Sequence, residues 1–151
     1  MADVEVEILV GKDLTQSTVK LSSLIGKKGM VLYFYPKDST LGCTTEACNF
    51  RDSNDKIRSL GYSVVGVSPD SISSHQRFAE KQQLNFALIS DTNKTLCQQF
   101  QVWQQKQLYG RQFMGVVRST FLIDTKLKVL NVISPVKVKG HTKEILDLIH
   151  K

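Results

Sequence analysis

Two of the three cysteines in this sequence, Cys43 and Cys48, lie five residues apart in the stretch YFYPKDSTLGCTTEACNF. Five residues of a regular helix advance by about 7.5 Å and turn by about 140°, which places the two Cα atoms roughly 8 to 9 Å apart. A disulfide needs Cα atoms within about 7 Å, so two helical residues at this spacing cannot be bridged until the first turns of the helix unwind. The spacing suits a two-step chemistry, in which Cys43 is oxidised to a sulfenic acid and Cys48 then condenses with it.

The predicted position of Cys43, at the join between a loop and the first turn of a helix, favours a reactive thiol. Only about 3% of an ordinary thiol is ionised at pH 7. Unpaired N–H groups at a helix N-terminus favour an anion, but the helix dipole supplies at most about 2 kcal/mol, so a further donor or cation is needed. The alternative is that both cysteines are ordinary small apolar residues of a helix, because free cysteines are often buried and inert.

The elements that position these cysteines follow from hydrophobic periodicity. The continuous apolar run from Met30 to Tyr35 is typical of a strand buried on both faces. Apolar residues then recur at helical steps from Cys43 to Leu60, and Gly61 ends that helix. The predicted strands are 4–10, 30–35, 62–68, 86–89, 116–123 and 127–133, the last two as an antiparallel hairpin; the predicted helices are 43–60, 72–82, 92–100 and 142–150, and 21–29 holds a helical turn. This order predicts an α/β protein with a thioredoxin-like fold, a central mixed β-sheet with helices on both faces.

Composition excludes several classes of protein. A chain of 151 residues, 41% hydrophobic and 23% charged, can bury the core of one domain. The net charge of +6 comes from scattered basic residues without a zinc or RNA-binding signature, so we expect no nucleic-acid partner. No apolar run approaches the roughly 20 residues of a membrane span. Three cysteines are too few for a disulfide scaffold and the N-terminal stretch is acidic where a signal peptide would be basic, so we expect a reducing, cytoplasmic location.

The stretch FYPKDSTLGCTTEACNFRD closely resembles the active-site segment of the bacterioferritin comigratory protein / peroxiredoxin Q group of peroxiredoxins. The core of that segment, P-x-x-x-T-x-x-C, consists here of Pro36, Thr40 and Cys43, and a second cysteine five residues on is typical of this group. Three later stretches, VVGVSPDSISSHQRFAEK, LYGRQFMGVVRSTFLID and KGHTKEIL, resemble the group in the same order. The resemblance extends over nearly the whole chain and implies one thioredoxin-like domain of the AhpC/TSA type, residues 1–151.

The resemblance implies an enzyme that reduces hydrogen peroxide and organic (alkyl) hydroperoxides with a thiolate, without a metal or other cofactor. Cys43 looks like the peroxidatic nucleophile and Cys48 like the resolving cysteine that closes an intramolecular disulfide. Thr40 is expected to place its hydroxyl beside the thiolate and the peroxide, Pro36 to shield the pocket, and Arg118 to be the active-site arginine, the additional cation. A dithiol protein, thioredoxin or a glutaredoxin-like partner, is expected to reduce the disulfide. The family analogy favours a monomer.

Two positions in the cysteine-bearing segment need separate comment. Leu41 stands where the family usually has proline, which would start the helix well; we expect leucine to affect rates more than the reaction, by making the helix start easier to unwind. Glu46 lies where the family often has an acidic or amide residue, in what we predict to be the first helical turn. Its alternative interpretation is a carboxylate that stabilises the helix N-terminus.

Other residues with chemical potential receive structural interpretations. Cys97 is predicted to be a buried structural thiol, the alternatives being glutathione capping or dimer formation. His75, near the inner edge of its helix, is predicted to be a boundary residue rather than a base. His141 and His150 flank the last helix without a second ligand at a useful spacing, so we expect no metal. The segment 103–109, WQQKQLY, is predicted to be a loop that packs over the site, as core or lid.

Two further functions stay open at this stage. A general thiol–disulfide oxidoreductase on the same fold would favour the C-x-x-C spacing and would not need Thr40 three residues before its nucleophile. A redox sensor or chaperone without enzymatic activity would use a Cys43–Cys48 switch to change partners. Turnover of peroxide with a reductant separates the peroxidase from both.

Overall fold

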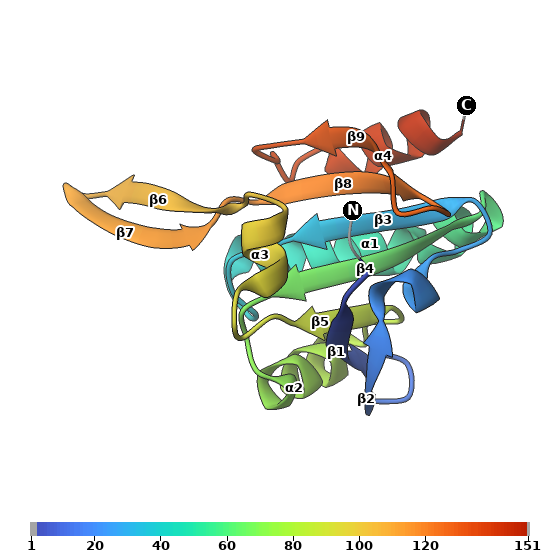
Figure 1. Ribbon diagram of the computed structural model, residues 1–151, viewed down its shortest axis with the longest axis horizontal. Helices are drawn as coiled ribbons and strands as arrows, with labels where there is room; N and C mark the ends of the chain where they lie inside the picture. The colour runs from blue at the N-terminus through green and yellow to red at the C-terminus, as the bar shows by residue number, and fades with distance from the viewer. Residues whose placement is uncertain (1–2, 151) are drawn as a thin grey trace.

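A seven-stranded mixed β-sheet forms the centre of the computed structural model, which describes residues 3–150 (Figure 1). The strand order is β2-β1-β5-β4-β3-β8-β9. The strands β3, β4 and β5 run parallel, and the outer pairings are antiparallel. The bounds are β1 Glu5–Val10, β2 Thr15–Lys20, β3 Gly29–Phe34, β4 Tyr62–Ser68, β5 Ala87–Ser90, β8 Ser119–Asp124 and β9 Val129–Ile133.

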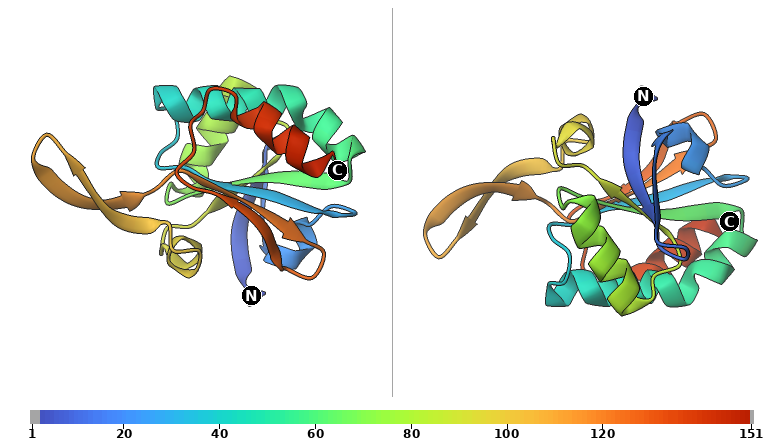
Figure 2. Two further views of the ribbon diagram at one scale, coloured as in Figure 1. Left: turned by 90° about the horizontal axis from the view of Figure 1, so that it is seen from above. Right: turned by 90° about the horizontal axis from the view of Figure 1, so that it is seen from below.

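Helices cover both faces of this sheet, as the sequence predicts (Figure 2). The helices α1 (Leu41–Ser59), α2 (Ile72–Gln82) and α4 (His141–Ile149) lie on one face. The short helix α3 (Thr95–Gln99) and a 3₁₀ helix, η1 (Leu21–Leu24), lie on the other. Each face therefore has its own apolar core, and every residue of the central strand β3 is buried between them. No helix within residues 3–150 has both the length and the apolar character that a bilayer crossing requires.

The pairing of β3 with β8 brings distant residues to one end of the sheet. The strands are antiparallel, and Phe34 at the carboxyl end of β3 pairs with Ser119 at the start of β8. Arg118, directly before β8, therefore lies beside the loop that leaves β3 and leads into α1. This register places the start of α1 and Arg118 next to each other, although they are far apart in the sequence.

Two features of the fold differ from the sequence-based expectations. The edge strand β2 was not predicted, because TQSTVK is polar and mostly exposed, without the alternation of a half-buried strand. The segment 103–109 is not a loop over the site: it contributes β6 (Trp103–Leu108), which pairs with β7 (Arg111–Val116) in a separate hairpin. This hairpin projects beyond the sheet at the end where α1 begins (Figures 1 and 2). Apolar residues in its glutamine-rich sequence recur neither at helical steps nor at every second position, so the sequence did not indicate a helix or a strand.

Candidate active site

Cys43 lies in the first turn of α1, with its side chain buried. The helix begins at Leu41, two residues earlier than predicted, and Thr40 is the N-cap residue. The first hydrogen bond of the helix runs from the N–H of Thr44 to the carbonyl of Thr40, at 2.8 Å. The N–H groups before Thr44 belong to the helix end that has no intrahelical partner, so the Cys43 sulfur lies at the positive end of the helix dipole.

The guanidinium of Arg118 joins Cys43 to a buried carboxyl group. Its Nη2 donates a hydrogen bond to the Cys43 sulfur at 3.2 Å, and its Nη1 donates to Oε1 of Glu46 at 2.6 Å. Burial lowers the pKa of Arg118, but the charges of Glu46 and Cys43 outweigh burial and raise it above its ordinary value. Arg118 is therefore a permanent cation against the Cys43 sulfur, the additional cation that a stable thiolate at this position needs.

Glu46 does not lie in the first turn of α1, where the alternative interpretation of a carboxylate that stabilises the helix N-terminus requires it. It is the sixth residue of α1, and its side chain is only 2% exposed. Burial raises its pKa from 4.5 to about 7, although Arg118 opposes the shift by charge and by its hydrogen bond. Its second oxygen, Oε2, has no hydrogen-bond partner among the described residues. The three-residue spacing from Cys43 was the signal in the sequence, since it places both side chains on one face of the helix.

Gly42 leaves the room that Arg118 needs. A Cβ at this position would lie 3.2 Å from Nη2 of Arg118, the nitrogen that contacts the Cys43 sulfur. Such an approach is closer than ordinary van der Waals contact, so a larger residue at position 42 would press on the guanidinium. Glycine at position 42 is thus explained by the closeness of the Arg118 guanidinium.

Thr40 and Pro36 precede Cys43 closely in the sequence, but the hydroxyl of Thr40 has a partner other than the Cys43 sulfur. The side chain of Thr40 is exposed, and its hydroxyl donates to the carbonyl of Lys37 at 3.1 Å. Pro36 is half-buried at the end of β3. Their expected roles, a hydroxyl beside the peroxide and a shield for the pocket, stay predictions.

A buried network that the sequence did not reveal holds the loop before α1. Oδ1 of Asp38 accepts a hydrogen bond from the Tyr35 hydroxyl at 2.6 Å, and Oδ2 accepts one from Ser74 Oγ at 2.9 Å. The same Oδ2 lies 2.7 Å from Nδ1 of His75, whose Nε2 donates to the Ile89 carbonyl at 2.9 Å. The prediction that His75 is a boundary residue is wrong, because its side chain is fully buried. The network ties the loop to α2 and β5.

Asp38, Asp70 and His75 form the one grouping of ligand-type side chains found among residues 3–150, with their ligand atoms within 4.8 Å of one another. Each of these atoms already takes part in hydrogen bonds. Asp70 Oδ2, for example, accepts from the N–H of Asp38 at 2.8 Å and from Ser68 Oγ at 2.7 Å. The grouping is therefore accounted for as the network that fixes the loop.

Cys48 and Cys43 belong to one continuous helix and have different neighbours. Both sulfurs are free, and the Cys48 sulfur lies 3.5 Å from Oε1 of Gln82 at the end of α2. The Cys43 sulfur instead contacts Arg118, directly before β8. The prediction that both residues are helical and unbridged in the resting fold is confirmed, so closing a bond between them requires part of α1 to unwind.

The remaining candidates have structural surroundings. Cys97 is fully buried on α3, and burial, followed by its hydrogen bond to Asp91 and that residue's charge, raises the pKa of its thiol far above the ordinary range. These surroundings agree with the predicted structural role. Burial lowers the pKa of His141, whose Nε2 lies 2.8 Å from Thr120 Oγ1. His150 is the C-cap residue of α4.

Lys106, on the hairpin, is a further charged residue that the sequence did not indicate as part of the site. Burial and the charge of Arg118 lower the pKa of its ammonium, whereas the charge of Cys43 raises it. The Lys106 Nζ donates to the Val116 carbonyl at 2.8 Å. Lys106 is thus bonded to a residue two positions before Arg118, while Tyr109 at the hairpin turn is almost fully exposed.

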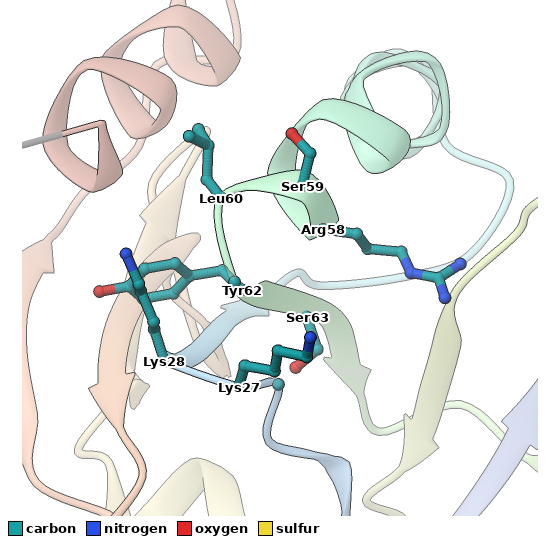
Figure 3. Close-up of a pocket in the computed structure, with 9 residues that line it drawn as sticks. Lys27, Lys28, Arg58, Ser59, Leu60, Tyr62 and Ser63 are labelled. Atoms are coloured by element: carbon teal, nitrogen blue, oxygen red, sulfur yellow. The ribbon is translucent and has the colours of Figure 1, made fainter.

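A separate pocket of about 480 Å³ lies at the opposite end of α1 (Figure 3). Lys27, Lys28, Arg58 and Tyr62 are among its lining residues, and Arg58 extends away from Tyr62. A helix of 19 residues is about 28 Å long, so this pocket is remote from Cys43. Its basic side chains suit the negative end of the helix dipole and need no ligand to explain them.

Comparison with known proteins identifies close relatives. The AhpC/TSA family model matches residues 2–132. Peroxiredoxin Bcp of Bacillus subtilis is 49% identical over 130 residues, which make up 86% of this chain and 82% of that protein. A structure of Xanthomonas campestris peroxiredoxin Q superimposes with a TM-score of 0.86 at 37% identity and covers 97% of this chain and 89% of its own. The Xanthomonas campestris bacterioferritin comigratory protein, studied for its alkyl peroxide reduction activity, gives 0.85 at 36% identity, with 97% and 90% covered.

The titration of Glu46 predicts a pH dependence of stability that a Glu46→Gln variant lacks. Because the pKa of this carboxyl is about 7 in the folded chain instead of 4.5, the stability it contributes in its protonated form is fully present below pH 4.5 and is lost as the pH rises through about 7. From this group alone, the free energy of unfolding should fall by roughly 2 to 3 kcal/mol between about pH 5 and pH 8. The Glu46→Gln variant should not show this fall.

Urea unfolding of the wild type and of Glu46→Gln at both pH values measures the difference. The comparison cancels the contributions of the titrating groups that lie away from Glu46 and Arg118, because both proteins contain these groups. An identical pH dependence in the two proteins would show that Glu46 is not the group that titrates.

Proposed function

The chain belongs to the AhpC/TSA family, in its peroxiredoxin Bcp and peroxiredoxin Q group, and from that premise we propose that Cys43 is the thiol with which it reduces peroxides. The thiol peroxidase activity follows from the family. The assignment of the nucleophile rests above all on one observation, the 3.2 Å contact between the Cys43 sulfur and Nη2 of Arg118 at the start of α1. That contact and the helix dipole both favour the anion that attacks peroxide.

In the first step, the Cys43 thiolate attacks the terminal oxygen of the hydroperoxide. A sulfur–oxygen bond forms, the oxygen–oxygen bond breaks, and the departing alkoxide or hydroxide takes up a proton to leave as an alcohol or water. Arg118 and the unpaired N–H groups at the start of α1 stabilise the charge that moves onto the departing oxygen. In this proposal the Thr40 hydroxyl orients the peroxide and Pro36 shields the site.

In the second step, Cys48 closes an intramolecular disulfide with the sulfenic acid of Cys43. The first turns of α1 unwind to allow it, because the two residues are too far apart in the intact helix. Without this closure, excess peroxide would carry Cys43 to the irreversible sulfinic and sulfonic acids. The disulfide is the form that an external reductant recognises.

We place this domain, residues 1–151, in the cytoplasm as a monomer. Three free cysteines suit a reducing compartment. The substrates are hydrogen peroxide and alkyl hydroperoxides, and the relative from Xanthomonas campestris studied for alkyl peroxide reduction supports the second class. The reductant is a dithiol protein of the thioredoxin or glutaredoxin type, which exchanges with the disulfide and returns both thiols.

Serine variants of the two cysteines separate the steps. We expect one equivalent of hydrogen peroxide to be consumed rapidly by the wild type and by Cys48→Ser, and only slowly by Cys43→Ser, because serine supplies no thiolate. Peptide mass mapping without reductant should find a 43–48 linkage in the wild type alone. Slow consumption by all three proteins would contradict the peroxidase assignment and favour thiol exchange or a redox sensor.

Proline at position 41 should stabilise the protein and slow disulfide closure. Leu41 is the first helical residue and is 87% exposed, and Thr40 before it has φ −80° and ψ 157°, the conformation that a following proline requires. Leu41→Pro should raise the free energy of unfolding by about 0.4 to 1 kcal/mol and hinder unwinding of the helix start. Leu41→Ala, which removes the same side chain without fixing the backbone, is the control. Closure as fast in Leu41→Pro as in Leu41→Ala would argue against unwinding from this end.

A further inference from the structure

The resolving cysteine has a charged environment of its own, separate from that of Cys43. Cys48 is half-buried on the side of α1 that faces α2. Its thiol donates to Oε1 of Gln82 at 3.5 Å, a weak hydrogen bond that holds the sulfur at the end of α2. The activation by Arg118 therefore does not extend to Cys48, although Cys48 must also become a thiolate in order to attack.

Arg51 supplies a cation at that place. It follows Cys48 by three residues on the same helix, a spacing at which side chains are neighbours. Its Nη1 donates to the carbonyl of Gln82 at 2.6 Å, and its Nε donates to Oδ1 of Asp52 at 3.0 Å. A guanidinium has five N–H donors, so these two bonds leave others free for the sulfur. The pKa of Arg51 is raised, first by its bond to Asp52 and also by the charge of Cys48.

The backbone around Arg51 is anchored. Nδ2 of Asn85 donates to the carbonyl of Arg51 at 3.2 Å, and Nδ2 of Asn54 donates to the carbonyl of Asn85 at 3.0 Å. These bonds tie the helix from Arg51 onward to the segment that follows α2. The cation therefore keeps its place while the turns before Cys48 unwind.

We propose that Arg51 favours the thiolate form of Cys48 and so drives the resolving step. The proposal rests on the proposed function, which supplies the sulfenic acid at Cys43. The Cys48 thiol loses its proton to solvent, and the thiolate attacks the Cys43 sulfur. The sulfur–sulfur bond forms as the sulfur–oxygen bond breaks, and hydroxide leaves and takes up a proton as water. The sulfenic acid is the oxidant, so no further co-reactant is needed.

A purely structural role for Arg51 predicts a different result. If the side chain only clamped α1 to the carbonyl of Gln82, its removal would loosen the helix and leave disulfide closure unchanged or faster. If it acts on the Cys48 sulfur, removal slows closure at neutral pH and the loss disappears at alkaline pH, where the thiol ionises without help. The direction of the change and its pH dependence separate the two roles.

The test measures the two steps separately in Arg51→Gln, Arg51→Lys and a control, Arg58→Gln, which removes an exposed arginine two turns along the same helix. Peroxide loss in the first turnover reports sulfenic acid formation, and rapid quenching with an alkylating reagent followed by mass spectrometry reports disulfide closure. We expect first-step rates like that of the wild type in all variants. Closure should be about tenfold slower in Arg51→Gln near neutral pH, with its profile moved to higher pH, and partly preserved in Arg51→Lys.

Two results would overturn the proposal: closure in Arg51→Gln as fast as in Arg58→Gln, or a slowing by the same factor at every pH. Thermal unfolding of each variant identifies any loss of fold. Absence of sulfenic acid in the wild type would instead contradict the proposed function itself, and the first-step measurement detects that failure independently.

Discussion

The site depends on one guanidinium that lies between two buried acidic groups. Arg118 donates to the Cys43 sulfur and to Glu46 with different nitrogens of the same planar group. A buried anion without a partner is costly, so each acid depends on Arg118, and Arg118 in turn stays in place because Glu46 holds it. The raised pKa of Glu46 shows that burial outweighs even this pairing. The more of its charge Glu46 loses, the more of the guanidinium's field remains for the thiolate.

A second constraint is that the same helix must be both rigid and able to open. In the resting fold, α1 holds Cys43 against Arg118, and the loop before it is fixed by Asp38 and His75. Farther along, Arg51 and Asn54 fasten the helix to the segment after α2. The stretch 39–50 lies between these two anchors and contains both cysteines. Unwinding can thus be local, since the rest of the helix and the sheet keep their contacts.

The fold and the helical positions of Cys43 and Cys48 could be predicted because their signals lie in short, continuous stretches of the sequence. The strand β4 and the helix α2 were predicted with their observed bounds, as each is a single periodic run. Arg118 came only from the resemblance, because 75 residues separate it from Cys43 and just the β3–β8 register brings them together. The Asp38–His75 pair was missed for the same reason, although the helical spacing of His75 and Phe78 does place this histidine on the buried face of α2. The hairpin β6–β7 was missed because it projects from the sheet and its glutamines follow no period of burial.

The rate of Cys43 oxidation in an Arg118→Gln variant tests the central claim most directly. Stopped-flow mixing of the reduced protein with hydrogen peroxide would follow sulfenic acid formation, with Arg111→Gln on the exposed hairpin as the control. If Arg118 stabilises both the thiolate and the charge on the departing oxygen, its loss should slow this step by about 10² to 10³ while the control keeps the rate of the wild type. A rate in Arg118→Gln equal to that of the control, in a protein that is still folded, would contradict the account.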